Sequence, residues 1–217
     1  MTLRTLLFDL DGTLADTGPD LAFALNRILA DEQRAELPYE RIRPQVSHGG
    51  AALLHLGFPE LRIDSAAFDA LRLRMLAVYR ANIARHTRLF PGMEAVLDTI
   101  EARGMNWGVV TNKPAWLTQP LLEQLGLVRR AACIVSGDTT AHKKPHPAPM
   151  LLACNQSGSA APQCLYIGDA QRDIQAGRNA GMPTLVALFG YLGGEDRPEN
   201  WGADGLVNTP QDILDWI

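Results

Sequence analysis

Apolar residues divide the chain into a short first strand and a long region where strand and helix patterns alternate. The run from Thr5 to Phe8 is largely apolar and ends at Asp9, which is typical of a buried strand leading into a loop. After Pro91, segments of helical period alternate with short apolar runs, and this alternation predicts a parallel sheet with helices on both faces. The expected strands cover residues 107–110, 132–136, 165–167, 184–187 and 206–207, and the expected helices cover residues 93–103, 116–125, 148–155, 174–180 and 210–217. The predicted fold class is α/β, a Rossmann-like doubly wound parallel sheet.

An all-helical insert interrupts this α/β region directly after its first strand. Apolar residues recur at helical spacing from Pro19 onward, and a proline suits the first turn of a helix. Within the insert, the segment VSHGG (Val46 to Gly50) is expected to form a loop between shorter helices. The predicted core covers residues 1–15 and 89–217, and the predicted cap domain covers residues 16–88. Such a cap would lie over the C-terminal edge of the sheet, where open α/β sheets bind their ligands.

Composition and charge narrow the classes of function. The chain has 217 residues, 47% of them hydrophobic, and its 20 Lys and Arg against 24 Asp and Glu give a formal net charge of −4. Without a basic excess, we expect no nucleic-acid partner and no binding to anionic membranes. The sequence shows no signal peptide and no apolar stretch long enough to span a bilayer. Its three cysteines lack CxxC spacing, which argues against a disulfide framework or a zinc site, so a cytoplasmic protein is expected.

Four polar clusters are each expected to follow a predicted strand. They are Asp9 and Asp11; Thr111, Asn112 and Lys113; His142, Lys143 and Lys144; and Asp169 and Asp173. Because the carboxyl ends of parallel strands lie at one edge of a sheet, the four clusters are predicted to meet there. Any one of them alone is explained equally well as polar loop surface. Their joint placement is what favours a functional site.

The four aspartates of these clusters favour a metal ion. Carboxylates crowded into one crevice cost free energy unless a cation neutralises them, and Mg²⁺ is the hard ion that prefers oxygen ligands. Asp169 begins the run GDAQRDIQAG at an expected helix start, so Asp173, four residues later, is expected to face the same point. The alternative is that Asp169 and Asp173 only complement the positive end of that helix.

Hydroxyl, amide and lysine side chains in the other clusters favour phosphoryl chemistry. A phosphoryl group in transfer carries negative charge on its oxygens, and Thr111, Asn112 and Lys144 could bind that charge. The alternatives are a strand-end hydroxyl for Thr111 and a solvated turn before a proline for the lysines. The adjacent Lys143 and Lys144 leave open which lysine would act.

Four segments carry a resemblance to a known family. DLDGTLADT, VVTNK, KKPHP and GDAQRDIQAG resemble, in this order, the four signature motifs of the haloacid dehalogenase (HAD) superfamily. The resemblance spans nearly the whole chain and is to the phosphoglycolate phosphatase-like branch, whose members carry a helical cap of the C1 type. Further segments, namely LFPGM, WGVVTNKP, LLAC and ENWGAD, resemble a narrower group, the N-acetylmuramic acid 6-phosphate phosphatases of cell-wall recycling.

The resemblance implies a phosphatase that works through an aspartyl-phosphate intermediate. Asp9 would attack the phosphorus, and Asp11 would protonate the leaving alcohol and then activate water. Thr111 would hydrogen-bond the phosphoryl oxygens, and Lys144 would neutralise the phosphoryl group and the nucleophile. The dehalogenases of the superfamily lack the second acid, so Asp11 favours phosphate chemistry over carbon–halogen cleavage.

The same resemblance implies Mg²⁺ as the cofactor. It would be held by the side chain of Asp9, the backbone carbonyl of Asp11 and the side chain of Asp169. Asp173 would be a further ligand or would contact the ligands from the surrounding shell. Gly12 would let the backbone approach the phosphate closely. The expected partner is a small phosphorylated metabolite, either phosphoglycolate or a sugar phosphate such as N-acetylmuramic acid 6-phosphate, and the sequence does not tell which proteins, if any, bind this chain.

The VSHGG segment is the expected contact between cap and substrate. Its glycines would let the backbone bend over the ligand, and its serine and histidine offer hydrogen bonds. The full expected substrate-binding set is Gly12, Ser47, His48, Gly49, Gly50, Thr111 and Asn112. A plain turn between helices, with a solvent-facing histidine, explains the VSHGG segment equally well.

Two other functions stay open for this sequence. A sugar-phosphate mutase of the same superfamily would use the same nucleophile. A phospho-aspartate signalling switch also combines an acidic magnesium pocket with a threonine and a lysine on a doubly wound sheet. Such switch domains are shorter, carry their nucleophile at a later strand and lack a helical insert after the first strand. The lifetime of the aspartyl-phosphate distinguishes the enzyme from the switch.

Overall fold

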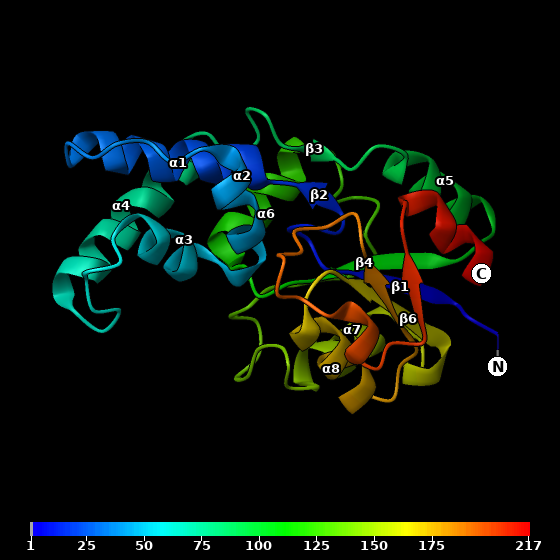
Figure 1. Ribbon diagram of the computed structural model, residues 1–217. Helices are drawn as coiled ribbons and strands as arrows, with labels where there is room; N and C mark the ends of the chain where they lie inside the picture. The colour runs from blue at the N-terminus through cyan, green and yellow to red at the C-terminus, as the bar shows by residue number, and fades with distance from the viewer. Residues whose placement is uncertain (1) are drawn as a thin grey trace.

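Six strands form a parallel sheet in which the first strand lies near the middle (Figure 1). The computed structural model describes residues 2–217. The strands are β1 (Thr5–Phe8), β4 (Asn106–Val110), β5 (Ile134–Val135), β6 (Cys164–Gly168), β7 (Thr184–Ala187) and β8 (Gly205–Val207). They follow the order β5-β4-β1-β6-β7-β8, and every neighbouring pair is parallel. This arrangement confirms the predicted doubly wound α/β fold.

Helices cover both faces of the sheet because the side chains of its central strand alternate between two apolar clusters. The core helices are α5 (Met93–Ala102), α6 (Ala115–Gln124), α7 (Ala148–Ser157) and α8 (Gln171–Asn179). Leu6 and Phe8 of β1 pack in one cluster with residues of α5 and α6, whereas Leu7 packs in the other with residues of α7 and α8. Figure 1 shows α5 on one side of the strands and α7 and α8 on the other. Every residue of β1 is fully buried, which explains its lack of polar alternation.

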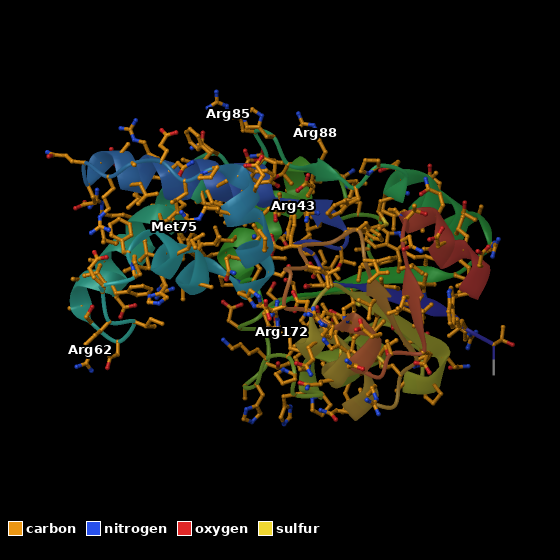
Figure 2. The ribbon with its side chains drawn as sticks, in the orientation of Figure 1. Arg43, Arg62, Met75, Arg85, Arg88 and Arg172 are labelled. Atoms are coloured by element: carbon orange, nitrogen blue, oxygen red, sulfur yellow. The ribbon has the colours of Figure 1, made fainter. Side chains whose placement is uncertain are left out.

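A helical insertion lies beside the C-terminal edge of the sheet, as the sequence predicts. It consists of α1 (Gly18–Asp31), α2 (Tyr39–Ile42), the 3-10 helix η1 (Arg43–His48), α3 (Gly50–Gly57) and α4 (Ala66–Ala81). Pro19 occupies the first turn of α1, whose Leu25 and Ile28 are buried together with Phe68 and Met75 of α4. Figure 2 shows Met75 inside the insertion, and Figure 1 shows the insertion to one side of the sheet. The insertion therefore has an apolar interior, which is continuous with the apolar cluster on the α5 and α6 face of the sheet.

A short antiparallel ribbon joins the insertion to the sheet. Its strands are β2 (Ala15–Asp16) and β3 (Arg88–Leu89), so the chain enters and leaves the insertion at one place. We propose that the domains divide at this ribbon, with a core of residues 1–15 and 89–217 and a cap of residues 16–88.

Two local expectations were wrong. The expected strand at residues 132–136 is limited to Ile134–Val135, because β5 lies at the sheet edge and pairs only with β4. The expected VSHGG loop is mostly helical, since Val46 to His48 end η1 and Gly50 begins α3. Gly49 alone interrupts the two helices, with a φ of 85° that a residue without a Cβ adopts freely.

Candidate active site

Three aspartates from neighbouring strand ends meet at the C-terminal edge of the sheet. Asp9 follows β1, Asp169 follows β6, and Asp173 lies in the first turn of α8. All three are buried, and one carboxylate oxygen of each lies within 4.8 Å of the others. The structure thus brings together three of the four residues expected to bind a metal. Carboxylates this close need a cation between or beside them.

The two later aspartates reach this point in a different way from the one expected. Helix α8 begins at Gln171, so Asp169 lies in the preceding loop and shares no helix face with Asp173. Asp173 Oδ2 instead accepts a hydrogen bond from the backbone N–H of Ala170 (3.0 Å), which caps the helix. The expectation of a common helix face was therefore wrong, and the tight loop between β6 and α8 is what joins the carboxylates.

Asp169 is held so that one of its oxygens is left for a cation. Its Oδ2 accepts hydrogen bonds from the hydroxyl of Ser47 (2.6 Å) and the backbone N–H of Tyr191 (2.9 Å). Its buried Oδ1 has no hydrogen-bond partner within residues 2–217. A buried carboxylate oxygen without a partner is costly in a folded protein, and a bound metal ion would satisfy it. The residues present therefore fit a metal centre.

The electrostatics of the aspartates agree with this interpretation. Burial, together with repulsion from Asp9 and Asp173, raises the pKa of Asp169 to about 7. Burial also raises the pKa of Asp173, although the neighbouring Lys144 ammonium opposes the rise. Ionising all three carboxylates therefore costs free energy unless a cation compensates their charge.

Lys144 is buried against two of the aspartates. Only 2% of its surface is exposed, and its Nζ lies 2.9 Å from Asp9 Oδ1 and 2.7 Å from Asp173 Oδ1. The same ammonium donates to the backbone carbonyl of Val110 (2.9 Å) and the hydroxyl of Tyr166 (2.7 Å). The neighbouring Lys143 is exposed. Of the two adjacent lysines, Lys144 is therefore the one that contacts Asp9.

Asn112 brings the Lys144 loop to the site. Lys144 lies well beyond the end of β5, so the expectation that its cluster directly follows a strand was wrong. The Asn112 side chain donates to the backbone carbonyl of Lys144 and accepts from its N–H, both at 3.0 Å. These two bonds fold the loop back over the strand ends. Both polar groups of the Asn112 side chain are thus used, while its role in substrate binding stays a prediction.

Asp11 lies beside the three aspartates but has partners of its own. Its Oδ1 accepts from Lys113 Nζ at 2.8 Å and from the hydroxyl of Thr17 at 2.5 Å. Lys113 also lies over the ring of Tyr79 in α4, with its Nζ 4.6 Å from the ring centre. The side chain of Asp11 is absent from the group of close carboxylates among the described residues. Metal binding through its backbone carbonyl stays a prediction.

A cavity of about 430 Å³ opens between the strand ends and the insertion. Its lining includes ten of the expected site residues and their neighbours, namely Asp9, Asp11, Ser47, His48, Gly49, Gly50, Thr111, Asn112, Lys143 and Lys144. His48 and Gly49 are exposed, and Thr111 is buried with its hydroxyl accepting from the Lys113 N–H (3.1 Å). The cavity has the size of pockets that bind small molecules.

Four lining residues with polar side chains were not assigned a role from the sequence. They are Arg72 and Tyr79 of α4, Lys113 after β4, and Arg172 of α8. Arg172 donates to the backbone carbonyl of Ser47, and Figure 2 shows it between the core and the insertion. Lys113 lies inside the segment VVTNK and Arg172 inside GDAQRDIQAG. Their position in these motif segments was the sequence signal that could have identified them as site residues. Arg72 and Tyr79 stand in an amphipathic helix pattern that does not distinguish a site residue from a core residue.

Gly12 is required because no side chain fits at its position. Its φ is +86°, and an added Cβ would lie 2.1 Å from Asp169 Oδ2 and 2.8 Å from a ring carbon of Tyr191. The backbone after β1 therefore touches the carboxylate that follows β6. Gly12 therefore belongs to the close packing around Asp169, one of the three clustered aspartates.

We expect Gly12→Ala to be far more harmful than Gly104→Ala. Both glycines have a positive φ, so each alanine costs about 1–2 kcal/mol in backbone strain. Gly104 has open space around it, whereas at Gly12 the added Cβ overlaps Asp169 and should cost about 1–3 kcal/mol more. Urea unfolding of both variants measures the difference. Equal free energies of unfolding would contradict the close approach described here.

Comparisons with known proteins agree with this geometry. A family model described as haloacid dehalogenase-like hydrolase matches residues 6–187. The chain is 45% identical over 210 residues to a phosphoglycolate phosphatase of Xanthomonas campestris pv. campestris, covering 97% of this chain and 94% of the relative. It is 39% identical over 213 residues to an N-acetylmuramic acid 6-phosphate phosphatase of Pseudomonas putida, covering 98% of this chain and 95% of the relative.

A solved structure shows the same arrangement of elements. The crystal structure of a protein from Haemophilus somnus 129pt, described as a predicted phosphoglycolate phosphatase, superimposes with a TM-score of 0.88 at 27% identity and covers 100% of this chain and 98% of the other. None of the helices within residues 2–217 has the length and apolar character that a membrane crossing requires. The resemblance noted from the four sequence segments is confirmed: the chain belongs to the haloacid dehalogenase-like hydrolase family.

Proposed function

We propose that this chain is a phosphatase that hydrolyses a small phosphomonoester through an aspartyl-phosphate on Asp9. The contact that carries the proposal is the one between Asp9 and Lys144. Asp9 Oδ1 forms an ion pair with Lys144 Nζ (2.9 Å) and accepts a hydrogen bond from the backbone N–H of Leu10 (2.8 Å). No hydrogen bond to Oδ2 is made within residues 2–217, so this oxygen is available to attack.

The chemistry proceeds in two displacements at phosphorus. In the first, Asp9 Oδ2 forms a bond to phosphorus while the bond to the substrate oxygen breaks, and Asp11 supplies the proton that the leaving alkoxide takes up. In the second, Asp11 removes a proton from water, the water oxygen bonds to phosphorus, and the bond to Asp9 breaks. Lys144 and Thr111 bind the negative charge of the phosphoryl oxygens during both steps. The net reaction is hydrolysis of the ester to an alcohol and inorganic phosphate.

We infer that the resident metal ion is Mg²⁺, held by Asp9, Asp169 and Asp173. An all-oxygen set of buried carboxylates suits a hard cation. When bound, the ion would neutralise charge on the phosphoryl oxygens and on the carboxylates themselves. The unpartnered Oδ1 of Asp169 supports a ligand role for this residue.

Added MgCl2 should therefore raise the melting temperature in the absence of substrate, and a chelator should stop hydrolysis. The stabilisation expected at a concentration of about 100 times the Kd is about 2.7 kcal/mol, because the ion binds the folded chain in preference to the unfolded one. Differential scanning calorimetry in MgCl2, against NaCl of equal ionic strength, measures it. Hydrolysis that continues at full rate after chelation would contradict a metal-dependent mechanism.

The relatives suggest two substrates for this proposed activity. Those at 45% and 39% identity are named for phosphoglycolate and for N-acetylmuramic acid 6-phosphate, respectively. The cavity of about 430 Å³ is lined from the cap by Arg72 and His48, which could bind polar groups beyond the phosphate of either molecule. We propose that one of these two compounds is the physiological substrate.

The decisive measurement is kcat/KM for both compounds side by side, with inorganic phosphate as the detected product. A preference of about 100-fold or more, equivalent to about 2.7 kcal/mol, would identify the substrate for which the cavity is built. Chromatography of the organic product should show only the dephosphorylated alcohol. A phosphorylated isomer formed without free phosphate would indicate a mutase and would contradict the proposed hydrolysis.

A further inference from the structure

We propose that Ser47 of the cap is a positioning residue of the metal site, so that cap closure and metal binding strengthen each other. The proposal rests on the metal-dependent function proposed above. Its basis is the hydrogen bond of 2.6 Å from the Ser47 hydroxyl to Oδ2 of Asp169. This bond runs from η1 of the cap to a carboxylate of the core. Part of the environment of a metal ligand is therefore supplied by the cap.

The hydroxyl helps to decide which oxygen Asp169 presents to a cation. Oδ2 already accepts two hydrogen bonds, one from the cap and one from the N–H of Tyr191 at 2.9 Å. Oδ1 is the buried, unpartnered oxygen among the described residues. Hydrogen bonds to one oxygen of a carboxylate orient the other one, and such outer contacts tune metal affinity in proteins. If the cap moved away, Asp169 would lose one of its two donors.

Helix η1 is attached to the core at two further points. Arg172 of α8 donates to the backbone carbonyl of Ser47. One turn earlier in η1, Arg43 Nη2 donates to the carbonyls of Phe189 (3.1 Å) and Gly190 (2.8 Å), in the loop that precedes Tyr191. Figure 2 shows Arg43 and Arg172 at the junction between cap and core. Both guanidinium groups bind backbone carbonyls, so they contribute to closure whichever substrate is present.

Tyr191 connects these contacts to the ribbon at the base of the cap. Its N–H binds Asp169, and its ring lies 5.2 Å from the guanidinium carbon of Arg43. Its hydroxyl accepts from the N–H of Gly18 (2.7 Å) and donates to Asp16 (2.5 Å), next to the point where the chain enters the cap. One core residue thus contacts the metal ligand, η1 and the β2–β3 ribbon. Closing the cap and orienting Asp169 therefore use the same group of contacts.

These contacts imply a reciprocal coupling. If closure orients Asp169 and raises the affinity for the cation, then the bound cation must favour the closed cap by the same factor. A metal-loaded enzyme would close more readily over the substrate, whereas the metal-free enzyme would open more often. The bound metal would in this way contribute to excluding bulk water from the aspartyl-phosphate.

The first test is the Mg²⁺ affinity of Ser47→Ala, measured by isothermal titration calorimetry with MgCl2 and no substrate. We expect the Kd to rise about 10-fold, because the variant removes one donor to Asp169 and leaves the backbone contact of Arg172 in place. Ser47→Thr, which keeps a hydroxyl, should restore most of the affinity. The matched control is Gln45→Ala in the same helix, because Gln45 makes no side-chain hydrogen bond among residues 2–217 and does not line the cavity.

The second test adds a direct measure of closure, because a weaker affinity alone does not distinguish coupling through closure from a local effect on Asp169. Arg43→Gln removes an attachment of the cap that touches no carboxylate of the site, and it should raise the Kd for Mg²⁺ about 5-fold. In the wild type, MgCl2 should slow amide hydrogen exchange in η1 and the β2–β3 ribbon, and both Ser47→Ala and Arg43→Gln should reduce this protection.

Unchanged Mg²⁺ affinity in Ser47→Ala would overturn the positioning role. A weaker affinity in Ser47→Ala, with unchanged affinity and protection in Arg43→Gln, would overturn the coupling to closure. A wild type that binds no Mg²⁺ would instead overturn the proposed metal-dependent function, so the two failures are distinguishable. Circular dichroism of each variant verifies that the fold is retained.

Discussion

Asp9→Asn should lower kcat by at least about 1,000-fold without unfolding the chain. The amide oxygen that replaces Oδ1 can still accept the hydrogen bond from the N–H of Leu10 and lie against the Lys144 ammonium, so the site keeps its shape. The amide nitrogen that replaces Oδ2 is not a nucleophile, so no bond to phosphorus forms. Phosphate release measures kcat, and thermal unfolding measures the retained stability.

The control for this variant is Asp64→Asn at the far tip of the cap, next to Arg62 (Figure 2). It removes an equal charge from an exposed side chain and should leave kcat unchanged. Acid quenching of the wild type during turnover should also yield a phosphorylated peptide that contains residue 9, and Asp9→Asn should yield none. Turnover at the wild-type rate in Asp9→Asn would exclude the proposed nucleophile.

Lys144→Met should destabilise the metal-free chain by about 3–5 kcal/mol and abolish turnover. Methionine fills a similar volume but leaves Asp9 and Asp173 buried together without their shared cation. The variant also removes donors to the carbonyl of Val110 and the hydroxyl of Tyr166. Urea denaturation in the presence of a chelator measures the loss in free energy of unfolding.

Lys143→Met is the matched control for stability, because it changes the same residue type one position earlier. Lys143 is exposed and forms no ion pair among the described residues, so the change should stay within about 0.5 kcal/mol. Equal losses in the two variants would show that Lys144 is not held by the buried carboxylates. Added MgCl2 should recover part of the stability of Lys144→Met, because the ion supplies positive charge to the same carboxylates.

The fold was largely predictable because its signals are local. A strand buried on both faces, such as β1, is a short apolar run whatever it pairs with, and the helices of the core carry their own apolar stripe. The boundaries of β5 were not predictable, since an edge strand ends where its one neighbour stops pairing. The sequence indicated a break in the helices near Gly49, because glycine favours a turn. That this one residue is the whole break depends on how η1 and α3 pack.

The candidate site was predictable in its residue types but not in its contacts. Asp9, Thr111 and Asp169 stand near the ends of predicted strands, and parallel pairing places those ends together. Lys144 lies well beyond its strand and is brought there by the bonds from Asn112. The hydrogen bonds that leave Oδ1 of Asp169 unpartnered come from Tyr191 and from Ser47, a residue 122 positions earlier in the chain. No pattern of polarity or period carries that information, because a hydrogen bond between distant segments leaves no trace in the residues between them.

The sequence by itself thus determined the α/β fold, the helical insertion and the set of acids, because hydrophobic period and strand-end position are properties of neighbouring residues. Only the tertiary structure decided that Lys144 rather than Lys143 meets Asp9, that Asp11 pairs with Lys113, and that the cap contributes Ser47 to the surroundings of Asp169. These contacts join segments far apart in the chain, and their geometry is set by the packing of cap on core.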